Sequence, residues 1–207
     1  MTTIWGPLGW MTLHSMASVY PVGPTPAEKQ LMSVWLDLFR DTITCPSCRE
    51  HFTGALMKYR QSYPDMMSSR RQLLLATFRL HNSVNQRLSK PIHSTVDACF
   101  EQLRNNVKIR SAREYRVAYI THIRRHWRSM QDISGITAMK KINEMARIEN
   151  EYSASHDNNF EESIEPDVVV LALRTFDVNS EAPSPIRVMS RALPGGFRLT
   201  AGGLRFR

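Results

Sequence analysis

The chain has 207 residues, 42% of them hydrophobic, which is enough to bury one full core and a second small one. Its 27 Lys and Arg residues against 19 Asp and Glu residues give a formal net charge of +8, which suits nucleic acid, an acidic partner or an anionic cofactor but says nothing about the fold. Three cysteines are too few for a disulfide-stapled secreted domain, no apolar run approaches a membrane span, and residues 1–13 lack the pattern of a signal peptide, so we expect a soluble protein made without a secretory signal.

Two helices are predicted in the first forty residues. After a short lead-in over residues 5–9, the first runs from about Trp10 to Tyr20 and carries an aromatic ring, an imidazole and small apolar groups on one face. By itself this is compatible with an ordinary core face that contains one hydrogen-bonded histidine. The second helix has a capping box formed by Thr25 and Glu28 and ends near Thr42. Its apolar stripe follows helical spacing: Leu31, Val34, Trp35, Leu38 and Phe39.

A Cys-x-x-Cys motif, Cys45 to Cys48, lies at the start of the third predicted helix. Pro46 suits the first helical position, which makes Thr44 or Cys45 the cap, and the helix continues to about Tyr59. The sulfurs then lie near exposed backbone N–H groups, an environment that favours the thiolate and lowers the thiol pKa.

The motif is compatible with a redox disulfide, half of a zinc site or a chance pair. A four-cysteine zinc site is excluded by count, although Cys45, Cys48 and His51 could form a mixed site with Cys99 or His81. A c-type haem attachment needs a histidine directly after the second cysteine, where Arg49 stands. A thioredoxin-like unit needs a preceding strand, but the preceding pattern is helical, so what remains is a dithiol on an all-helical scaffold.

The fourth predicted helix starts near Ser68 or Ser69 and is stopped by Pro91. His81 and Asn85 lie one turn apart at the margin of its apolar stripe. Buried polar side chains without partners cost a few kcal/mol each, so these two should bond to something. Either an interhelical hydrogen-bond network or a bound ligand with a polar edge and a flat apolar body would satisfy them.

Taken together, four motifs resemble those of the Erv/ALR family of FAD-linked sulfhydryl oxidases. They are Trp10-x-x-x-His14-x-x-Ala17-x-x-Tyr20-Pro21, Thr25-Pro26-Ala27-Glu28-Lys29, Cys45-x-x-Cys48, and His81-Asn82-x-Val84-Asn85-x-x-Leu88-x-Lys90-Pro91. The resemblance covers residues 5 to about 98. It implies an all-α fold, a four-helix bundle with a short fifth helix and FAD at its mouth, and a homodimer through the first two helices. It also implies electron transfer from dithiols to O2 with release of H2O2.

The resemblance assigns roles within this site. Cys45 is attacked by the substrate thiolate, and Cys48, against the flavin ring, is expelled as a thiolate and passes two electrons to FAD. Aromatic and imidazole groups pack on the ring systems, asparagines meet polar edges, and Lys90 meets the phosphates. The expected FAD-binding residues are Gly6, Pro7, Gly9, Trp10, His14, Tyr20, Cys48, His51, His81, Asn82, Val84, Asn85 and Lys90, with no metal ligand.

Departures from the family pattern concern cysteines. Many cellular members carry a structural disulfide whose positions correspond here to Phe78 and Thr95, so that staple is missing, and Cys99 is expected to be a buried free thiol on the fifth helix. The chain has no N-terminal extension with shuttle cysteines, so electrons must come from a separate thioredoxin-like or other dithiol protein. A compact core and an unfamiliar C-terminal extension look most like the versions encoded by large DNA viruses, which would place the protein in the host cytoplasm or the virion.

The sequence divides into an FAD-binding oxidase domain (1–103), a basic helical extension (104–152), an acidic linker (153–167) and a C-terminal segment with a basic Gly/Arg tail (168–207). Within the extension, residues 104–128 are predicted to form one basic amphipathic helix, either a solvated charged face or a contact for nucleic acid or an acidic partner, and residues 135–152 a second helix. Val168 to Leu173 is compatible with a short buried strand. The alternative function is a zinc-stabilised or basic helical binding module without catalysis. Finding bound flavin in the protein would support the oxidase, and finding bound zinc would support the binding module.

Overall fold

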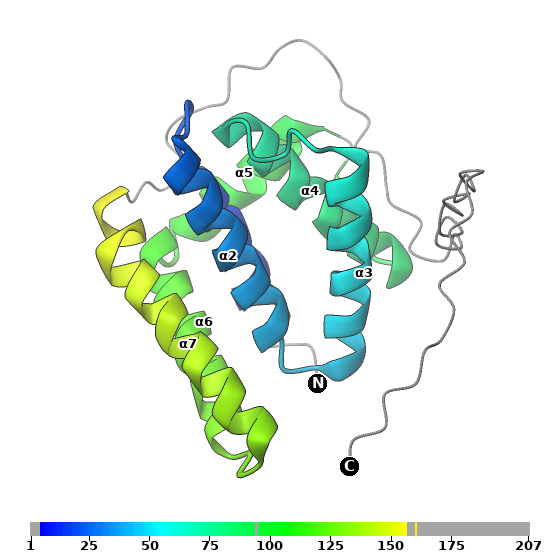
Figure 1. Ribbon diagram of the computed structural model, residues 1–207. Coiled ribbons are helices and arrows are strands. Elements are labelled where there is room, and N and C mark those ends of the chain that lie inside the picture. Colours follow the sequence, from blue (N-terminus) through cyan, green and yellow to red (C-terminus); the bar gives the residue numbers. More distant parts are fainter. Residues whose placement is uncertain (1–4, 94, 157–159, 161–207) are drawn as a thin grey trace, which may run out of the picture.

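The structure is a computed structural model that describes residues 5–93, 95–156 and 160. Its described part is all-α, as predicted, and no strand forms in it (Figure 1). The elements are α1 (Trp5–Val19), α2 (Pro26–Thr42), α3 (Pro46–Ser62), α4 (Arg70–Arg87), α5 (Val96–Val107), α6 (Ala112–Arg128), α7 (Ile133–Glu151) and the short 3-10 helix η1 (Ser153–His156). The predicted strand at 168–173 and the Gly/Arg tail lie outside the described residues.

The caps explain where most helices begin. Thr25 forms the predicted capping box, since its backbone N–H donates to Glu28 Oε2 at 2.8 Å and its hydroxyl accepts from the Glu28 N–H at 3.3 Å. Cys45 caps α3 and Ser69 caps α4, close to the predicted starts. The second, third and fourth predicted helices are therefore confirmed, α3 extending three residues further than expected.

The prediction for the start of the first helix is wrong. Residues 5–9, expected to be a lead-in, form the first turn and more of α1. Pro7 is tolerated there because the first N–H groups of a helix have no intrahelical acceptor. Gly9 has a packing role, because a Cβ at this position would lie 3.3 Å from Tyr119 Cε2.

The first five helices form the predicted bundle, with α1 packed on α4, α4 on α3, and α5 on α4. At the place where the family staple is missing, Phe78 on α4 makes an edge-to-face contact with Phe100 on α5, with ring centroids 5.4 Å apart. Thr95 caps α5 through the Ala98 N–H. An apolar ring contact thus joins the two helices here. Cys99 on α5 is a buried free thiol, as predicted.

The helices α6 and α7 form a hairpin that packs on the bundle, α6 against α1 and α7 against α2 (Figure 1). The single basic helix predicted over 104–128 is wrong, because α5 ends at Val107 and a new helix begins after Ser111, whose side chain forms a capping box with Glu114. The predicted helix at 135–152 is confirmed with bounds that differ by two residues or fewer.

The core is continuous from α1 to the start of the predicted linker. Side chains of α6 and α7 such as Tyr119, Ile142 and Met145 belong to the same buried cluster as those of the bundle. Ser153 and Phe160, in the predicted linker, are also buried. None of the described helices is both long and apolar enough to cross a membrane.

Candidate functional site

A cavity of about 260 Å³ opens between α1, α4, α5 and the first turns of α3. Eleven of the predicted FAD-binding residues line it: Gly6, Pro7, Gly9, Trp10, His14, Cys48, His81, Asn82, Val84, Asn85 and Lys90. Tyr20 and His51 are not among its lining residues. Tyr20 is fully buried and its hydroxyl donates to the Met67 carbonyl at 2.9 Å. The structure therefore brings together residues from positions 6 to 90 and leaves these two elsewhere.

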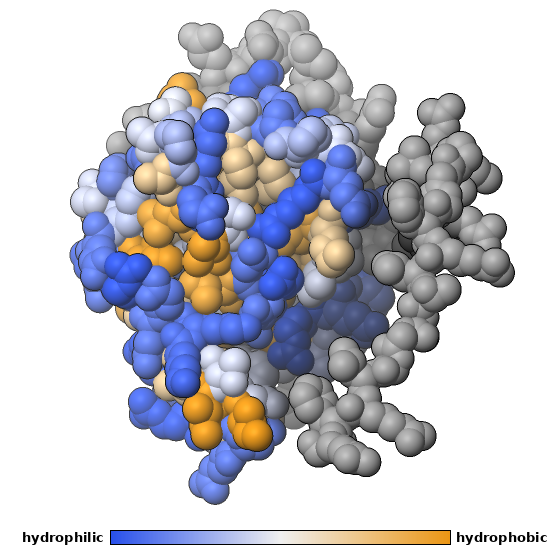
Figure 2. Space-filling model, in the orientation of Figure 1, coloured by the Kyte–Doolittle hydropathy of each residue, from blue (hydrophilic) through white to orange (hydrophobic). Residues whose placement is uncertain are grey.

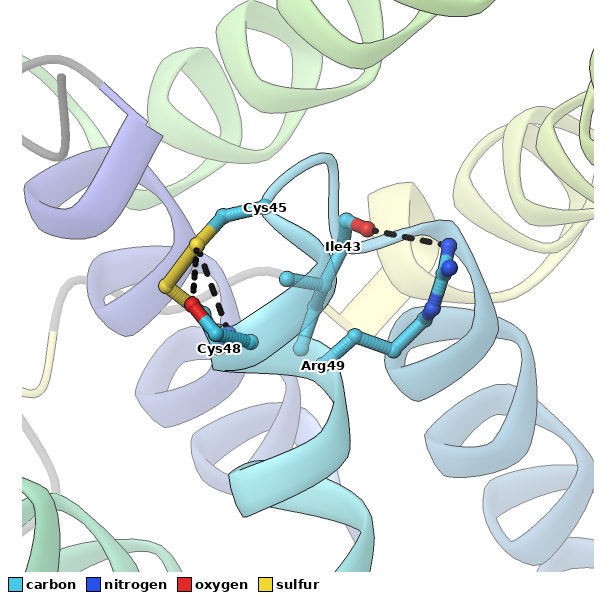
Figure 3. The surroundings of a disulfide bond; sticks show 5 residues. Ile43, Cys45, Cys48 and Arg49 are labelled. Atoms are coloured by element: carbon cyan, nitrogen blue, oxygen red, sulfur yellow. Dashed lines mark hydrogen bonds between the residues drawn. A yellow bond between two sulfur atoms is a disulfide. The ribbon is translucent and has the colours of Figure 1, made fainter.

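Cys45 and Cys48 form a disulfide at the N-terminus of α3 (Figure 3). The Cys48 N–H donates to Cys45 Sγ at 3.3 Å, so Cys45 caps its own helix with sulfur. Cys48 lines the cavity, whereas Cys45 does not and is followed by the exposed Pro46 and Ser47. The two sulfurs therefore connect the cavity with the surface of the molecule.

The electrostatics of the helix start favour a thiolate. No acidic residue lies in the first turn of α3. The Arg49 guanidinium lies 3.5 Å from the Ile43 carbonyl oxygen (Figure 3), and it lies 5.7 Å from the centre of the Trp127 ring on α6. The positive end of the helix dipole stabilises negative charge that develops on sulfur, whereas the Arg49 side chain is directed away from the disulfide (Figure 3).

Aromatic and imidazole rings form one wall of the cavity. Trp10 and His81 are stacked, with ring centroids 4.1 Å apart and planes 10° from parallel. Phe52 lies edge-on to Trp10 at 6.2 Å. This wall presents flat apolar surface from α1, α3 and α4 to whatever occupies the cavity.

A hydrogen-bond relay behind this wall fixes the protonation of both histidines. The Thr77 hydroxyl donates to the Leu74 carbonyl at 2.8 Å, so its oxygen accepts from His14 Nδ1 at 2.9 Å. His14 Nε2 then accepts from His81 Nδ1 at 3.0 Å. Burial, and secondarily the neighbouring His81, hold the pKa of His14 well below its usual range. Burial, followed by His93 and Lys90, lowers the pKa of His81 to about 3. Both rings are neutral, and His81 keeps Nε2 as a hydrogen-bond acceptor.

Asn82 has a structural role that the sequence did not reveal. Its Nδ2 donates to the His93 carbonyl at 2.7 Å, and the His93 N–H donates to its Oδ1 at 3.1 Å. The amide thus holds the segment after α4 against the bundle. His93 Nε2 in turn lies 2.6 Å from Gln102 Oε1 on α5, and both residues line the cavity. Neither was predicted, because no motif or spacing marks them.

The polar groups at the cavity fit a flat cofactor with an anionic tail. Trp5 Nε1 is buried at the cavity and has no hydrogen-bond partner in the described part of the chain. Lys90 and Arg87 line the opening and are exposed. Within residues 5–93, 95–156 and 160, no three His, Cys, Asp or Glu side chains are grouped as metal ligands.

Comparisons with known proteins agree with this site. The model of the Erv1 / Alr family matches residues 8–109. Protein 347L of Invertebrate iridescent virus 6 is 37% identical over 92 residues, which are 43% of this chain and 83% of the viral protein. An FAD-linked sulfhydryl oxidase of African swine fever virus is 34% identical over 90 residues, 44% of this chain and 72% of its own. The mitochondrial FAD-linked sulfhydryl oxidase erv1 of Schizosaccharomyces pombe is 37% identical over 83 residues, 40% of this chain and 44% of its own.

The match to the family model ends where the hairpin begins. The family model stops at residue 109, and the matched part spans less than half of the yeast relative. No solved structure matches the chain significantly. The family model therefore does not extend to α6 and α7.

Proposed function

The chain belongs to the Erv1 / Alr family, and we propose that it is an FAD-dependent thiol oxidase that converts dithiols of a partner protein to disulfides through Cys45 and Cys48. The observation that carries this proposal is the position of the disulfide, which has one sulfur at the cavity and the other outside it. A substrate thiolate can therefore react at the surface while electrons leave on the cavity side.

The thiol exchange follows from this geometry. A substrate thiolate attacks Cys45 Sγ, the Cys45–Cys48 bond breaks, and Cys48 leaves as a thiolate stabilised by the helix N-terminus. The second substrate thiolate then attacks the substrate sulfur of the mixed disulfide, which releases Cys45 and the oxidised substrate. FAD, when bound, supplies the two-electron acceptor that restores the Cys45–Cys48 disulfide and delivers the electrons to O2 as H2O2.

The lining residues divide into three groups by what they offer FAD. Trp10 and His81 offer flat faces for a ring system, and His81 Nε2 offers an acceptor to an N–H group. Trp5 Nε1 offers a donor. Lys90 and Arg87 offer positive charge at the opening, where phosphates are best stabilised. The roles given to Tyr20 and His51 stay predictions.

Replacing the cavity-side cysteine tests the proposal. Cys48→Ser removes the leaving thiolate but leaves the cavity walls intact, so we expect dithiol-dependent H2O2 production to fall to background while FAD content stays at the wild-type level. Peroxide release and the ratio of flavin to protein absorbance measure the two quantities. Full turnover in Cys48→Ser would overturn the assigned mechanism.

Finer assignments come from the resemblance and, for nucleic acid, from the basic composition of residues 104–128. A thioredoxin-like substrate, nucleic acid as a second partner of the basic helices, and a location in the host cytoplasm or the virion stay predictions. The zinc-stabilised module is not favoured, since the two motif sulfurs are joined to each other. A dithiol protein as substrate and O2 as acceptor follow from the oxidase activity itself.

A further inference from the structure

The α6–α7 hairpin packs on the two helices through which the family resemblance predicts a homodimer. Its first helix contacts α1, and its second contacts α2, beside which α7 lies in Figure 1. We propose that this hairpin takes the place of a second copy, so that the chain does not dimerise through α1 and α2 and its site is completed within one molecule.

A buried ion pair fastens the hairpin to α1. Arg116 on α6 donates from Nε to Glu149 Oε2 at 2.7 Å and from Nη2 to Oε1 at 3.1 Å, and its Nη1 donates to Ser15 Oγ on α1 at 2.7 Å. Arg116 and Glu149 are 1% and 4% exposed. Charges at such depth are tolerated only when paired in good geometry, so α1, α6 and α7 are built for one fixed arrangement.

The end of α2 is joined to the hairpin by polar contacts as well. Trp127 Nε1 donates to the Thr42 carbonyl at 2.9 Å, which satisfies one of the last carbonyls of α2. Lys141 Nζ on α7 donates to Asp41 Oδ2 at 2.5 Å. A second copy approaching the same surface would have to break these contacts.

The hairpin also supports the cavity wall. Tyr119 stacks on Phe39, with ring centroids 5.3 Å apart, and closes on Gly9. Phe39 and Gly9 both line the cavity. The wall formed by Phe39 and Gly9 is thus backed by α6 of the same chain, so no residue of another copy is needed at this position.

The side of α7 that faces away from the bundle is mostly polar. One stripe of α7 is buried: Gly135, Ala138, Ile142, Met145 and Ile148. The opposite side carries exposed polar residues, among them Lys140, Asn143 and Arg147. Figure 2 shows hydrophilic side chains along the lower part of α7, an apolar patch at the hairpin tip, where Met130, Ile133 and Ile136 are exposed, and a second apolar patch on the same face between α7 and α2. The apolar stripe is therefore already used in contacts with the bundle.

Light scattering coupled to size-exclusion chromatography tests the proposal on the full chain over a wide range of concentration. We expect a mass near 23.8 kDa at every concentration. The variant Ile133→Lys/Ile136→Lys, analysed in parallel, separates association through the exposed tip from association through α1 and α2.

A dimer that persists in the tip variant would overturn the proposal. If wild type forms a dimer and the tip variant does not, the dimer interface is the hairpin tip. That result supports the proposal, because association then does not occur through α1 and α2. Mass is measured without turnover, so this result stands apart from the test of the oxidase activity.

Discussion

At the scale of single residues, the His14–His81 relay makes stability depend on pH. Both histidines have a pKa in the folded protein below the unfolded value of about 6.5, that of His81 being about 3. At a pH between the folded and unfolded pKa values, the unfolded chain binds more protons than the folded protein. The contribution of the histidines to the free energy of unfolding is therefore complete above about pH 6.5 and is lost as pH falls toward 3. Each group contributes at most about 1.4 kcal/mol per pH unit in this window.

Urea unfolding at pH 7.5 and at pH 5 measures this dependence. We expect His81→Gln to flatten it, because glutamine does not titrate in this range. The exposed His156→Gln variant is the matched control and should keep the wild-type slope. If the change in unfolding free energy between the two pH values is the same in His81→Gln as in wild type, His81 does not cause the pH dependence.

Spacing on a helix accounts for which of the predicted residues line the cavity. The face that holds Trp10, His14 and His81 follows from periodicity. His93 and Gln102 could not be predicted, because the segment after α4 has no periodic pattern and its course is set by the Asn82 amide. Asn82 was expected at a polar edge of the cofactor. In the structure its side-chain amide is hydrogen-bonded to the backbone of His93.

At the scale of elements, the Arg116–Glu149 pair is the central contact of the hairpin. Arg116→Ala leaves the Glu149 carboxylate buried without its partner, so we expect a loss of about 3–5 kcal/mol of unfolding free energy. The double variant Arg116→Met/Glu149→Leu removes both charges and should recover most of it.

Denaturant midpoints measure both variants. The exposed Arg147→Ala, on the outer side of α7, is the matched control and should unfold close to wild type. A double variant as unstable as Arg116→Ala would contradict the role given to the pair, since it would show that the loss comes from packing alone.

Caps and stripes located most elements in advance. Thr25 with Glu28, and Pro46 after Cys45, are local signals that survive in the folded protein. The early start of α1 was missed because Gly6 and Pro7 suggest a turn, although both are allowed in a first helical turn. The start of α6 was missed although Ser111 and Glu114 form a capping box that can be seen in the sequence.

At the scale of the whole molecule, the division after residue 103 stays a prediction about domains, but the packing does not follow it. The helix α5 crosses this boundary, and α6 and α7 share one core with α1 and α2. Periodicity shows that a helix has a buried face and not what covers it. The basic composition of 104–128 also concealed that Arg116 is buried against Glu149.

The central claim is that the cavity holds FAD and that the Cys45–Cys48 pair passes electrons to it. The most direct measurement is the visible absorption spectrum of the purified full chain, followed after addition of a dithiol under air. We predict a flavin spectrum that bleaches and then recovers as H2O2 accumulates. A colourless protein that leaves the dithiol reduced would contradict the account.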